Sequence, residues 1–582
     1  MSTLAAGINP TILQRLKFDG KHIAFWTYIL VIGTFVILPL GLLLLNSFRS
    51  VSVGDLNFYF DKFTIANYVE AYSNASTYKM LFNSFWFAIG SMCVGITIGA
   101  SLAFFSERTD LPLRKTIPAI VMVPLVMPGV VEGIAWVFLL SPKIGLLNLL
   151  ANAVGIEGGL FNAYSLSAMI WVQGIGMSPL AFLLIAATLR QMDPALEEAA
   201  LGSGASVYKI ITRVTLPLLL PGIAGVSILL FIRGIEAFEI PLLLGFSSGI
   251  FVFSTNIYYA LRSAFPPDYG LGFAYSMTLI LLCLVALFFY QRQFKNSEKF
   301  TVVRGKGYRP RLIPMGRWRY LGWSCVVFYF LFVVVLPMII LIWASILPYY
   351  RPPSLAALAA VTLENYWAIL ESPELWDAVW NTIILAGISS TVIMFLAFLS
   401  SWFVYRTSLF GRKVLDFVVF LPYALPGIVI GVSFMVVFLS FPNPIYNTIW
   451  ILVLAYIVNY LPIGTRFTNA AILQIHKELE EAAQASGAGF FTTMVRIWMP
   501  LLIPSLINGM LFILILCIKV ISTAVLLQGP ESTVLPVYLW TLWDVGESGM
   551  ASALAVLMVL VVSLMMLVAR YFGGNRREAA VV

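Results

Sequence analysis

Two polar segments repeat each other in an otherwise apolar chain, at an offset of 283 residues. Each contains a glutamate, two alanines, a glycine and, further on, a proline. These residues are Glu198, Ala199, Ala200, Gly204 and Pro217 in the first copy, and Glu481, Ala482, Ala483, Gly487 and Pro500 in the second. An early glutamate favours a helix N-terminus, small alanines let another surface approach closely, and glycine can end the helix. The pattern predicts a short helix for non-covalent docking in each loop, at about 190–217 and 474–500.

The two predicted helices begin differently. Asp193 followed by Pro194 is a favourable helix start, whereas the second copy has His476 and Lys477 at these positions. We therefore expect the two copies to bind a partner unequally. A short amphipathic helix in such a loop could also lie on the membrane surface, but the matched spacing of two copies favours docking.

The repeated pattern reads E-A-A-x3-G-x9-[IV]-x-[LM]-P and resembles the EAA loop of permease subunits in binding-protein-dependent ABC importers. In that family the loop is a cytoplasmic helix that docks on the ATPase, and two copies in one chain resemble a fused permease. The resemblance implies two copies of a cytoplasmic ABC ATPase and a periplasmic substrate-binding protein as partners, and a bacterial inner membrane as location. The fused layout resembles the ferric-iron, thiamine, polyamine and phosphonate permease group.

The chain has no G-x4-G-K-[ST] motif, and Gly305-Lys306-Gly307 lacks the rest of it. If ATP drives this protein, ATP and Mg must bind to a separate partner ATPase. We therefore expect no catalytic residue, no metal site and no cofactor in this chain.

A charge in or near an apolar run is costly, and five such residues are candidates for function. These candidates for the translocation pathway are Glu132, Arg233, Glu236, Glu239 and Lys519. Arg233, Glu236 and Glu239 are spaced three residues apart, which predicts one helical stripe. Lys519 corresponds to Glu236 at the offset of 283, so we expect the two to approach each other between the halves. Alternatively, Arg233 pairs locally with Glu236, and Lys519 snorkels or pairs with another acid.

Four prolines stand near the start of two apolar runs, at equivalent positions. Pro124 and Pro128 correspond to Pro422 and Pro426 at an offset of 298. Because proline removes a backbone donor and kinks a helix, the paired positions suggest a gate or a cavity. Packing alone is the other explanation.

The composition predicts the class of fold in which these residues lie. Of 582 residues, 60% are hydrophobic and 11% are charged, which predicts an all-α polytopic membrane protein. The first apolar run is too long for a cleavable signal peptide. Four cysteines in apolar runs are expected to be buried free thiols. Twelve runs are long enough to span a membrane: about 24–46, 81–104, 117–140, 165–189, 215–245, 271–290, 321–347, 379–405, 415–440, 449–473, 501–528 and 549–571.

The distribution of Lys and Arg predicts the orientation. Alternate segments counted from the N-terminus hold 26 of the 35 basic residues and the opposite segments hold six. Both termini and both repeated loops are thus expected in the cytoplasm. The net charge of +8 then reflects topology and not nucleic-acid binding.

The repeats predict two halves, 1–290 and 321–582, joined by a basic cytoplasmic linker, 291–320, held near membrane lipid. Six spans per half give both halves the same orientation, related by a pseudo-twofold axis along the membrane normal. The external segments 47–80 and 348–378 each contain an Asn-Tyr pair. They either form part of the docking face for the binding protein or anchor the interface through aromatic residues.

The leading interpretation is the permease of an ATP-driven importer, with ferric iron as the first choice of substrate. A phosphonate, a polyamine, thiamine or another small solute is the alternative within this class. A twelve-span secondary transporter shares the parallel repeat, and a channel or scaffold shares the apolar spans. Neither requires two matched EAA loops.

Overall fold

The computed structural model describes residues 20–50, 63–156, 158–192, 195–297, 312–441 and 444–578. These residues form helices, and β structure within them is limited to two isolated bridges. The proposed helix start at Asp193 and Pro194 and residues 298–311 of the basic linker, including its glycine-lysine pair, lie outside the described residues.

The two halves are built from α-helices joined by short 3-10 and π segments. The first half contains α2 (Gly20–Ser47), α3 (Ala66–Ser73), α4 (Ala75–Arg108), α5 (Ile117–Met122), α6 (Gly129–Leu140), α7 (Leu146–Ala153), α8 (Leu166–Gln191), α9 (Ala195–Gly202), α10 (Val207–Ile210), α11 (Leu216–Glu236), α12 (Phe253–Tyr258) and α13 (Tyr269–Ser297). The second contains α14 (Trp318–Phe330), α15 (Leu336–Ser345), α16 (Leu355–Leu358), α17 (Glu364–Glu371), α18 (Pro373–Arg406), α19 (Arg412–Phe420), α20 (Gly427–Ser440), α21 (Ile449–Gln474), α22 (Lys477–Ala485), α23 (Phe490–Thr493), α24 (Met499–Lys519), α25 (Ala524–Leu527), α26 (Leu535–Asp544) and α27 (Ser548–Glu578). The joining segments are η1 (Arg114–Thr116), η2 (Val123–Val126), η3 (Ile211–Thr215), η4 (Pro241–Gly245), η5 (Phe246–Ser248), η6 (Tyr259–Ser263), η8 (Leu331–Val335), η9 (Leu421–Ala424) and η10 (Met494–Trp498).

Helices long and apolar enough to cross a membrane account for the predicted spans, so the all-α polytopic class is confirmed. In the described residues, ten such helices are single and three more candidates are bent pairs. Two of the bent pairs are the third and ninth predicted runs. The third pair, Pro241–Ser248 with Phe253–Ser263, was not predicted. The fifth run was predicted to continue to residue 245, but α11 ends at Glu236 because Ala237 is extended, with ψ of 137°.

The two-repeat architecture is confirmed by the register of the helices. α4 and α18 have the same length and lie 298 residues apart, while α8 and α21, like α11 and α24, lie 283 residues apart. α7 occupies the loop after the third span, where the second half is shorter. The sequence repeat therefore reports a repeat of three-dimensional structure.

The Asn-Tyr pairs hold the short helices α3 and α17 to the end of the preceding span. Asn365 donates to the carbonyl oxygens of Ser345 and Leu347 at 2.9 and 2.7 Å, and Tyr366 shares a 2.8 Å hydrogen bond with Ser345. The same three contacts recur around Asn67 in the first half. The recurrence of these pairs at equivalent positions is thus explained by hydrogen bonds that each pair makes within its own half.

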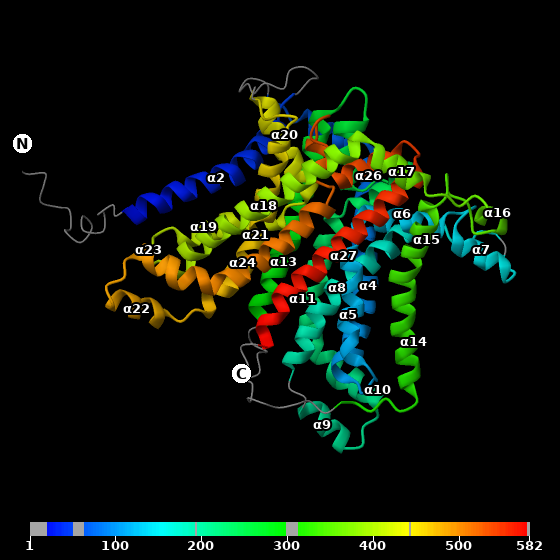
Figure 1. Ribbon diagram of the computed structural model, residues 1–582, viewed down its shortest axis with the longest axis horizontal. Coiled ribbons are helices and arrows are strands. Elements are labelled where there is room, and N and C mark those ends of the chain that lie inside the picture. Colours follow the sequence, from blue (N-terminus) through cyan, green and yellow to red (C-terminus); the bar gives the residue numbers. More distant parts are fainter. Residues whose placement is uncertain are drawn as a thin grey trace, which may run out of the picture.

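The first span of each half packs against the opposite half. Figure 1 shows α2, in blue, beside α18 and α19, and α14, in green, beside α5 of the first half. Tyr28 of α2 donates to the Leu396 carbonyl oxygen at 2.6 Å, and Tyr329 of α14 shares a 3.1 Å hydrogen bond with Ser178. The exchange of first spans interlocks the two halves.

The chain that follows the linker is fastened to the first half before α14 begins. Ile313 donates its backbone N–H to the Arg108 carbonyl oxygen at 2.9 Å, and the Asp110 carboxylate accepts from the Met315 N–H at 2.9 Å. This anchoring explains why α14 runs along α5 and not along its own half.

The outer surface of the spans is apolar, as lipid contact requires. Leu30, Phe288 and Leu567 are more than half exposed on α2, α13 and α27. Cys283 and Cys517 are buried free thiols as predicted, but Cys93 and Cys325 are exposed. That prediction was wrong for these two because a thiol behaves as a small apolar group on a lipid-facing surface as well as in a core.

Candidate functional site

Two short helices carry the repeated polar segments and lie on one side of the molecule. In Figure 1, α9 and α22 occupy the lower and left parts of the view, whereas α7, α16 and α17 lie at the opposite, upper right side. Both thus lie on the side away from α7, α16 and α17, although α9 belongs to the first half and α22 to the second.

The first of these helices, α9, is fixed by a buried carboxylate. Glu197 is 3% exposed, and its Oε2 lies 3.4 Å from Arg108 Nη1 at the end of α4. Its Oε1 accepts a 2.7 Å hydrogen bond from Thr215, directly before α11. Arg108 also donates to the Leu189 carbonyl oxygen at the end of α8, at 2.9 Å. One side chain of α9 therefore connects to three membrane spans.

The second loop is attached by different chemistry, at residues before and after α22 and not on the helix itself. Arg406, the counterpart of Arg108, donates to the Ile472 carbonyl oxygen at 2.8 Å and lies over the Trp498 ring at 4.8 Å. Glu480, the counterpart of Glu197, is not buried, and among the described residues no ion pair joins it to Arg406. The two loops are thus attached unequally, by a buried ion pair in one and a cation–π contact in the other.

The predicted docking residues lie on both helices. Ala199, Glu481 and Ala482 are exposed, Glu198 and Ala200 are partly exposed, and Ala483 is 8% exposed. Gly204 and Gly487 follow the helices with φ of +79° and +78°, where L-residues are strained. After Gly204, the Ala205 N–H donates to the Ala200 carbonyl oxygen at 3.0 Å and closes the helix end. Pro217 and Pro500 lie in the first turns of α11 and α24.

One shared feature of α9 and α22 was not predicted from the sequence. Leu196 and Leu479 stand at equivalent positions of α9 and α22 and are 55% and 46% exposed. The signal was available in the repeat, because both copies read Leu-Glu-Glu-Ala-Ala. The two leucines therefore give both helices the same exposed apolar position.

The third span of each half is broken at the predicted prolines. Arg114–Val126 meets Gly129–Leu140 at 94°, and Arg412–Ala424 meets Gly427–Ser440 at 109°. Pro128 and Pro426 are the extended residues directly before α6 and α20. Pro124 and Pro422 lie in the 3-10 segments η2 and η9 that precede the breaks. Each break leaves carbonyl groups outside regular helix hydrogen bonding.

Lys519 makes a contact between the halves at the first break. Its Nζ, at the end of α24, donates to the Leu125 carbonyl oxygen in η2 at 2.7 Å. It interacts electrostatically with Glu132 and Glu239, both in the first half. The predicted approach of Lys519 to Glu236 was wrong, because Glu236 is engaged by Arg233 on its own helix.

Arg233 makes the pseudosymmetric contact at the second break. Its Nη1 lies 2.5 Å from Glu236 Oε1, and its guanidinium lies 5.6 Å from the centroid of the Tyr423 ring in η9. Glu239 lies beyond the end of α11, against Gly129, so the predicted single stripe includes only Arg233 and Glu236. Each fifth span therefore ends on the broken third span of the opposite half.

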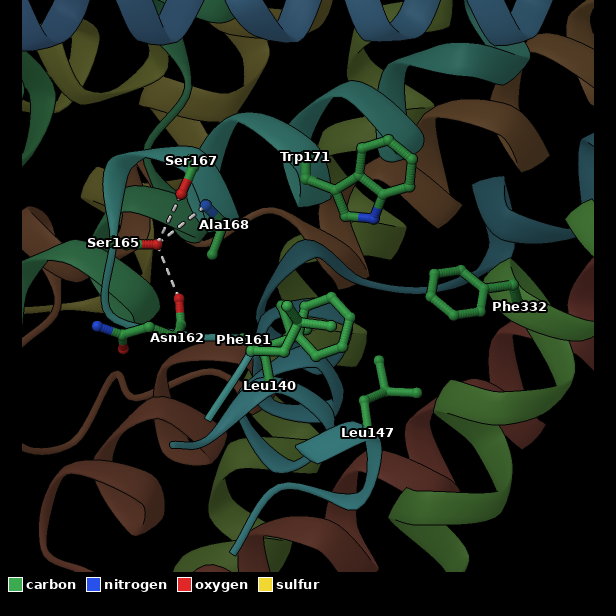
Figure 2. Close-up of a pocket in the computed structure, with 10 residues that line it drawn as sticks. Leu140, Leu147, Phe161, Asn162, Ser165, Ser167, Ala168, Trp171 and Phe332 are labelled. Carbon is green, nitrogen blue, oxygen red and sulfur yellow. Dashed lines mark hydrogen bonds between the residues drawn. The ribbon is translucent and has the colours of Figure 1, made fainter. Parts of the chain in front are cut away.

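An apolar cavity of about 380 Å³ lies away from these charges. Leu140, Leu147, Phe161 and Trp171 line it together with Phe332 of the second half. Figure 2 shows Ser165 at its edge, where dashed lines mark hydrogen bonds to Ser167, to the Ala168 N–H and to the Asn162 carbonyl oxygen. Because the serine is engaged locally and the walls are apolar, this cavity offers little to a charged solute.

Comparisons with known proteins identify the family. A profile described as "Binding-protein-dependent transport system inner membrane component" matches residues 95–296 and again residues 393–577. A ferric transport system permease protein of Actinobacillus pleuropneumoniae is 26% identical over 462 residues, which span 78% of this chain and 65% of that protein. A protein of Salmonella paratyphi A, named as a 2-aminoethylphosphonate transport system permease, is 25% identical over 247 residues, covering 42% of this chain and 88% of its own length.

Solved structures add a weaker similarity. A chain of a bacterial alginate ABC transporter, crystallised with an alginate pentasaccharide-bound periplasmic protein, is 19% identical with a TM-score of 0.36 and covers 44% of this chain and 93% of its own. The two profile matches, by contrast, cover more than half of the sequence. The chain belongs to the family of binding-protein-dependent transport system inner membrane components, with the family domain present twice in one fused chain.

Proposed function

We propose that this chain is the permease of an ATP-driven importer and that α9 and α22 each dock one copy of a cytoplasmic ABC ATPase. The observation that carries the proposal is the repeated Leu-Glu-Glu-Ala-Ala surface on two helices of the same face. Both expose a leucine at the same register, next to alanines that permit close approach. ATP and Mg bind in the partner, and this chain supplies the membrane pathway.

In this mechanism the fifth spans, α11 and α24, transmit movement from the repeated loops to the breaks in the third spans. α11 starts beside Thr215, which is bonded to the docking helix, and ends at Glu236, next to the break in the opposite half. α24 runs from Trp498, which lies under the Arg406 guanidinium at the end of α18, to Lys519 at the first break. Each has 21 residues, or about 30 Å of helix. Movement of a docked ATPase would thus reach the contacts at the breaks through one rigid element.

The orientation follows from the basic residues, with the docking helices and both termini in the cytoplasm. The opposite face, which carries α7, α16 and α17, is then available to a soluble binding protein that delivers the solute. Membrane lipid surrounds the apolar outer surface of the spans.

Ferric iron is our first choice of substrate, because similarity to a ferric permease extends over 78% of this chain. Similarity to a phosphonate permease covers one half and supports a phosphonate-type solute as the second choice.

Uptake by reconstituted complex tests both the function and the choice of solute. The full chain, its ATPase and its binding protein are placed in liposomes, and uptake of radiolabelled ferric iron and of 2-aminoethylphosphonate is compared with and without ATP. We expect ATP-dependent accumulation of iron. Accumulation that persists without ATP would contradict the proposal of an ATP-driven importer. Accumulation of 2-aminoethylphosphonate without accumulation of iron would make the phosphonate the substrate in place of iron.

A further inference from the structure

An arginine–aromatic ladder crosses the interface between the halves beside the second break. The guanidinium of Arg466 in α21 lies 4.5 Å from the centroid of the Phe420 ring. Phe420 stacks on Tyr423 with centroids 5.2 Å apart and an interplanar angle of 20°. Arg233 of the first half lies over the other end, 5.6 Å from the Tyr423 centroid. We call these four residues the arginine ladder.

The scaffold does not require the arginine ladder. At the repeat offsets, Arg466 corresponds to Leu183, Phe420 to Met122, Tyr423 to Leu125 and Arg233 to Leu516. All four members are thus replaced by aliphatic residues at the equivalent places in the other half. The same helices and the same broken span form there without them. The packing of these helices therefore does not explain why the ladder contains arginines and aromatic rings.

The charge of the ladder is only half neutralised. Arg233 is paired with Glu236. Arg466 is exposed, and within the described part of the chain it forms no ion pair. It stands eight residues from the end of α21, or about 12 Å into the span. An unpaired guanidinium at such a depth is costly against lipid, and such residues almost always face the bundle interior or an aqueous cavity.

The surroundings place the ladder between the halves. η9 packs against α21 of its own half and against α13 of the first half. Tyr290 of α13 lies within electrostatic range of Tyr423 and Arg466. Arg233 reaches the ladder from α11. Elements of both halves thus flank it, next to a break that the fifth span contacts.

We propose that the arginine ladder is a contact site for an oxyanion on the pathway between the halves. Guanidinium groups bind phosphate and carboxylate oxygens through paired hydrogen bonds, and the stacked rings keep the two arginines apart and accessible. The oxyanion is a phosphate, phosphonate or carboxylate group, either part of the solute or a ligand of a transported metal. The assignment rests on the proposed function, since it takes the space between the halves as the pathway.

Equilibrium binding of inorganic phosphate, citrate and 2-aminoethylphosphonate to the full chain in phosphatidylcholine nanodiscs tests the site. We expect saturable binding that weakens roughly tenfold or more in Arg466→Leu and in Arg233→Leu. Both variants install the residue of the other half. Arg233→Leu also leaves the Glu236 carboxylate without its partner, so it is combined with Glu236→Gln. Size-exclusion chromatography and thermal stability would verify that each variant keeps the fold. Arg466→Lys should bind with intermediate affinity, because it keeps the charge and loses the bidentate geometry.

Lys413→Leu is the matched control, since Lys413 is an exposed basic residue at the start of α19. Equal weakening in this variant, or no binding by the wild type, would overturn the site. Phosphatidylglycerol that co-purifies through Arg466 and is not displaced by phosphate would identify a lipid headgroup and overturn the pathway assignment. Co-purification of the ATPase with the same variants distinguishes a failure of this site from a failure of the importer function.

Discussion

Replacing Arg108 by glutamine should release α9 from the membrane domain and uncouple ATP hydrolysis from uptake. The substitution leaves Glu197 buried without its ion-pair partner, which costs about 3–5 kcal/mol. It also removes the donor to the Leu189 carbonyl oxygen. Hydrogen exchange of the α9 amides should accelerate on the order of 100-fold. Uptake by the reconstituted complex should fall further than ATP hydrolysis does.

The second loop provides the internal comparison for this experiment. Arg406→Gln removes hydrogen bonds and a cation–π contact worth about 1–2 kcal/mol but leaves no buried carboxylate behind. It should therefore accelerate exchange in α22 much less. Arg190→Gln breaks an ion pair whose arginine is 59% exposed and should change little. Equal effects of Arg108→Gln and Arg406→Gln would contradict the unequal attachment of the two loops.

Reversing the charge of Lys519 should abolish transport, and a specific second reversal should restore part of it. Lys519→Glu places a carboxylate beside Glu132 and Glu239 and removes the donor to the Leu125 carbonyl oxygen. Like charges at a partly buried site repel by several kcal/mol, so we expect uptake to fall tenfold or more, about the effect of 1.4 kcal/mol. Glu239→Lys or Glu132→Lys in the same chain should recover part of the uptake.

Glu236→Lys is the informative control for this pair of reversals. It lies at the position equivalent to Lys519 in the sequence repeat, but its carboxylate is 2.5 Å from Arg233. Combining it with Lys519→Glu should not restore uptake, because it creates a repulsion with Arg233. Rescue by Glu236→Lys, without rescue by Glu132→Lys or Glu239→Lys, would contradict the contacts at the first break.

The sequence alone was sufficient for the class, the repeat and the breaks in the spans. Apolar runs and basic loops are local patterns, and the prolines that break α-helical hydrogen bonding do so wherever they occur. The offsets of 283 and 298 were readable without a structure. The bent pair at Pro241–Ser248 and Phe253–Ser263 was missed, because its apolar composition resembles the end of a span.

Partners across the chain were not predictable from spacing. The repeat aligned Lys519 with Glu236, yet a pseudo-twofold axis need not bring equivalent residues together. The axis instead places a residue of one half against elements of the other half. Lys519 meets η2 and Arg233 meets η9 for this reason. The role of Glu197 was hidden as well, because adjacent glutamates look alike in sequence and only the orientation of α9 separates the buried one from its neighbour.

Docking of an ATPase on α9 and α22 is the central claim, and co-purification measures it most directly. The full chain is purified from its host membrane with its ATPase, as wild type and as the Glu198→Arg, Glu481→Arg double variant, and ATP hydrolysis is measured in lipid. We predict that the wild type retains the ATPase and that the double variant loses it while remaining folded. An ATPase that never associates with the wild type, or one that the double variant retains with full hydrolysis, would contradict the claim.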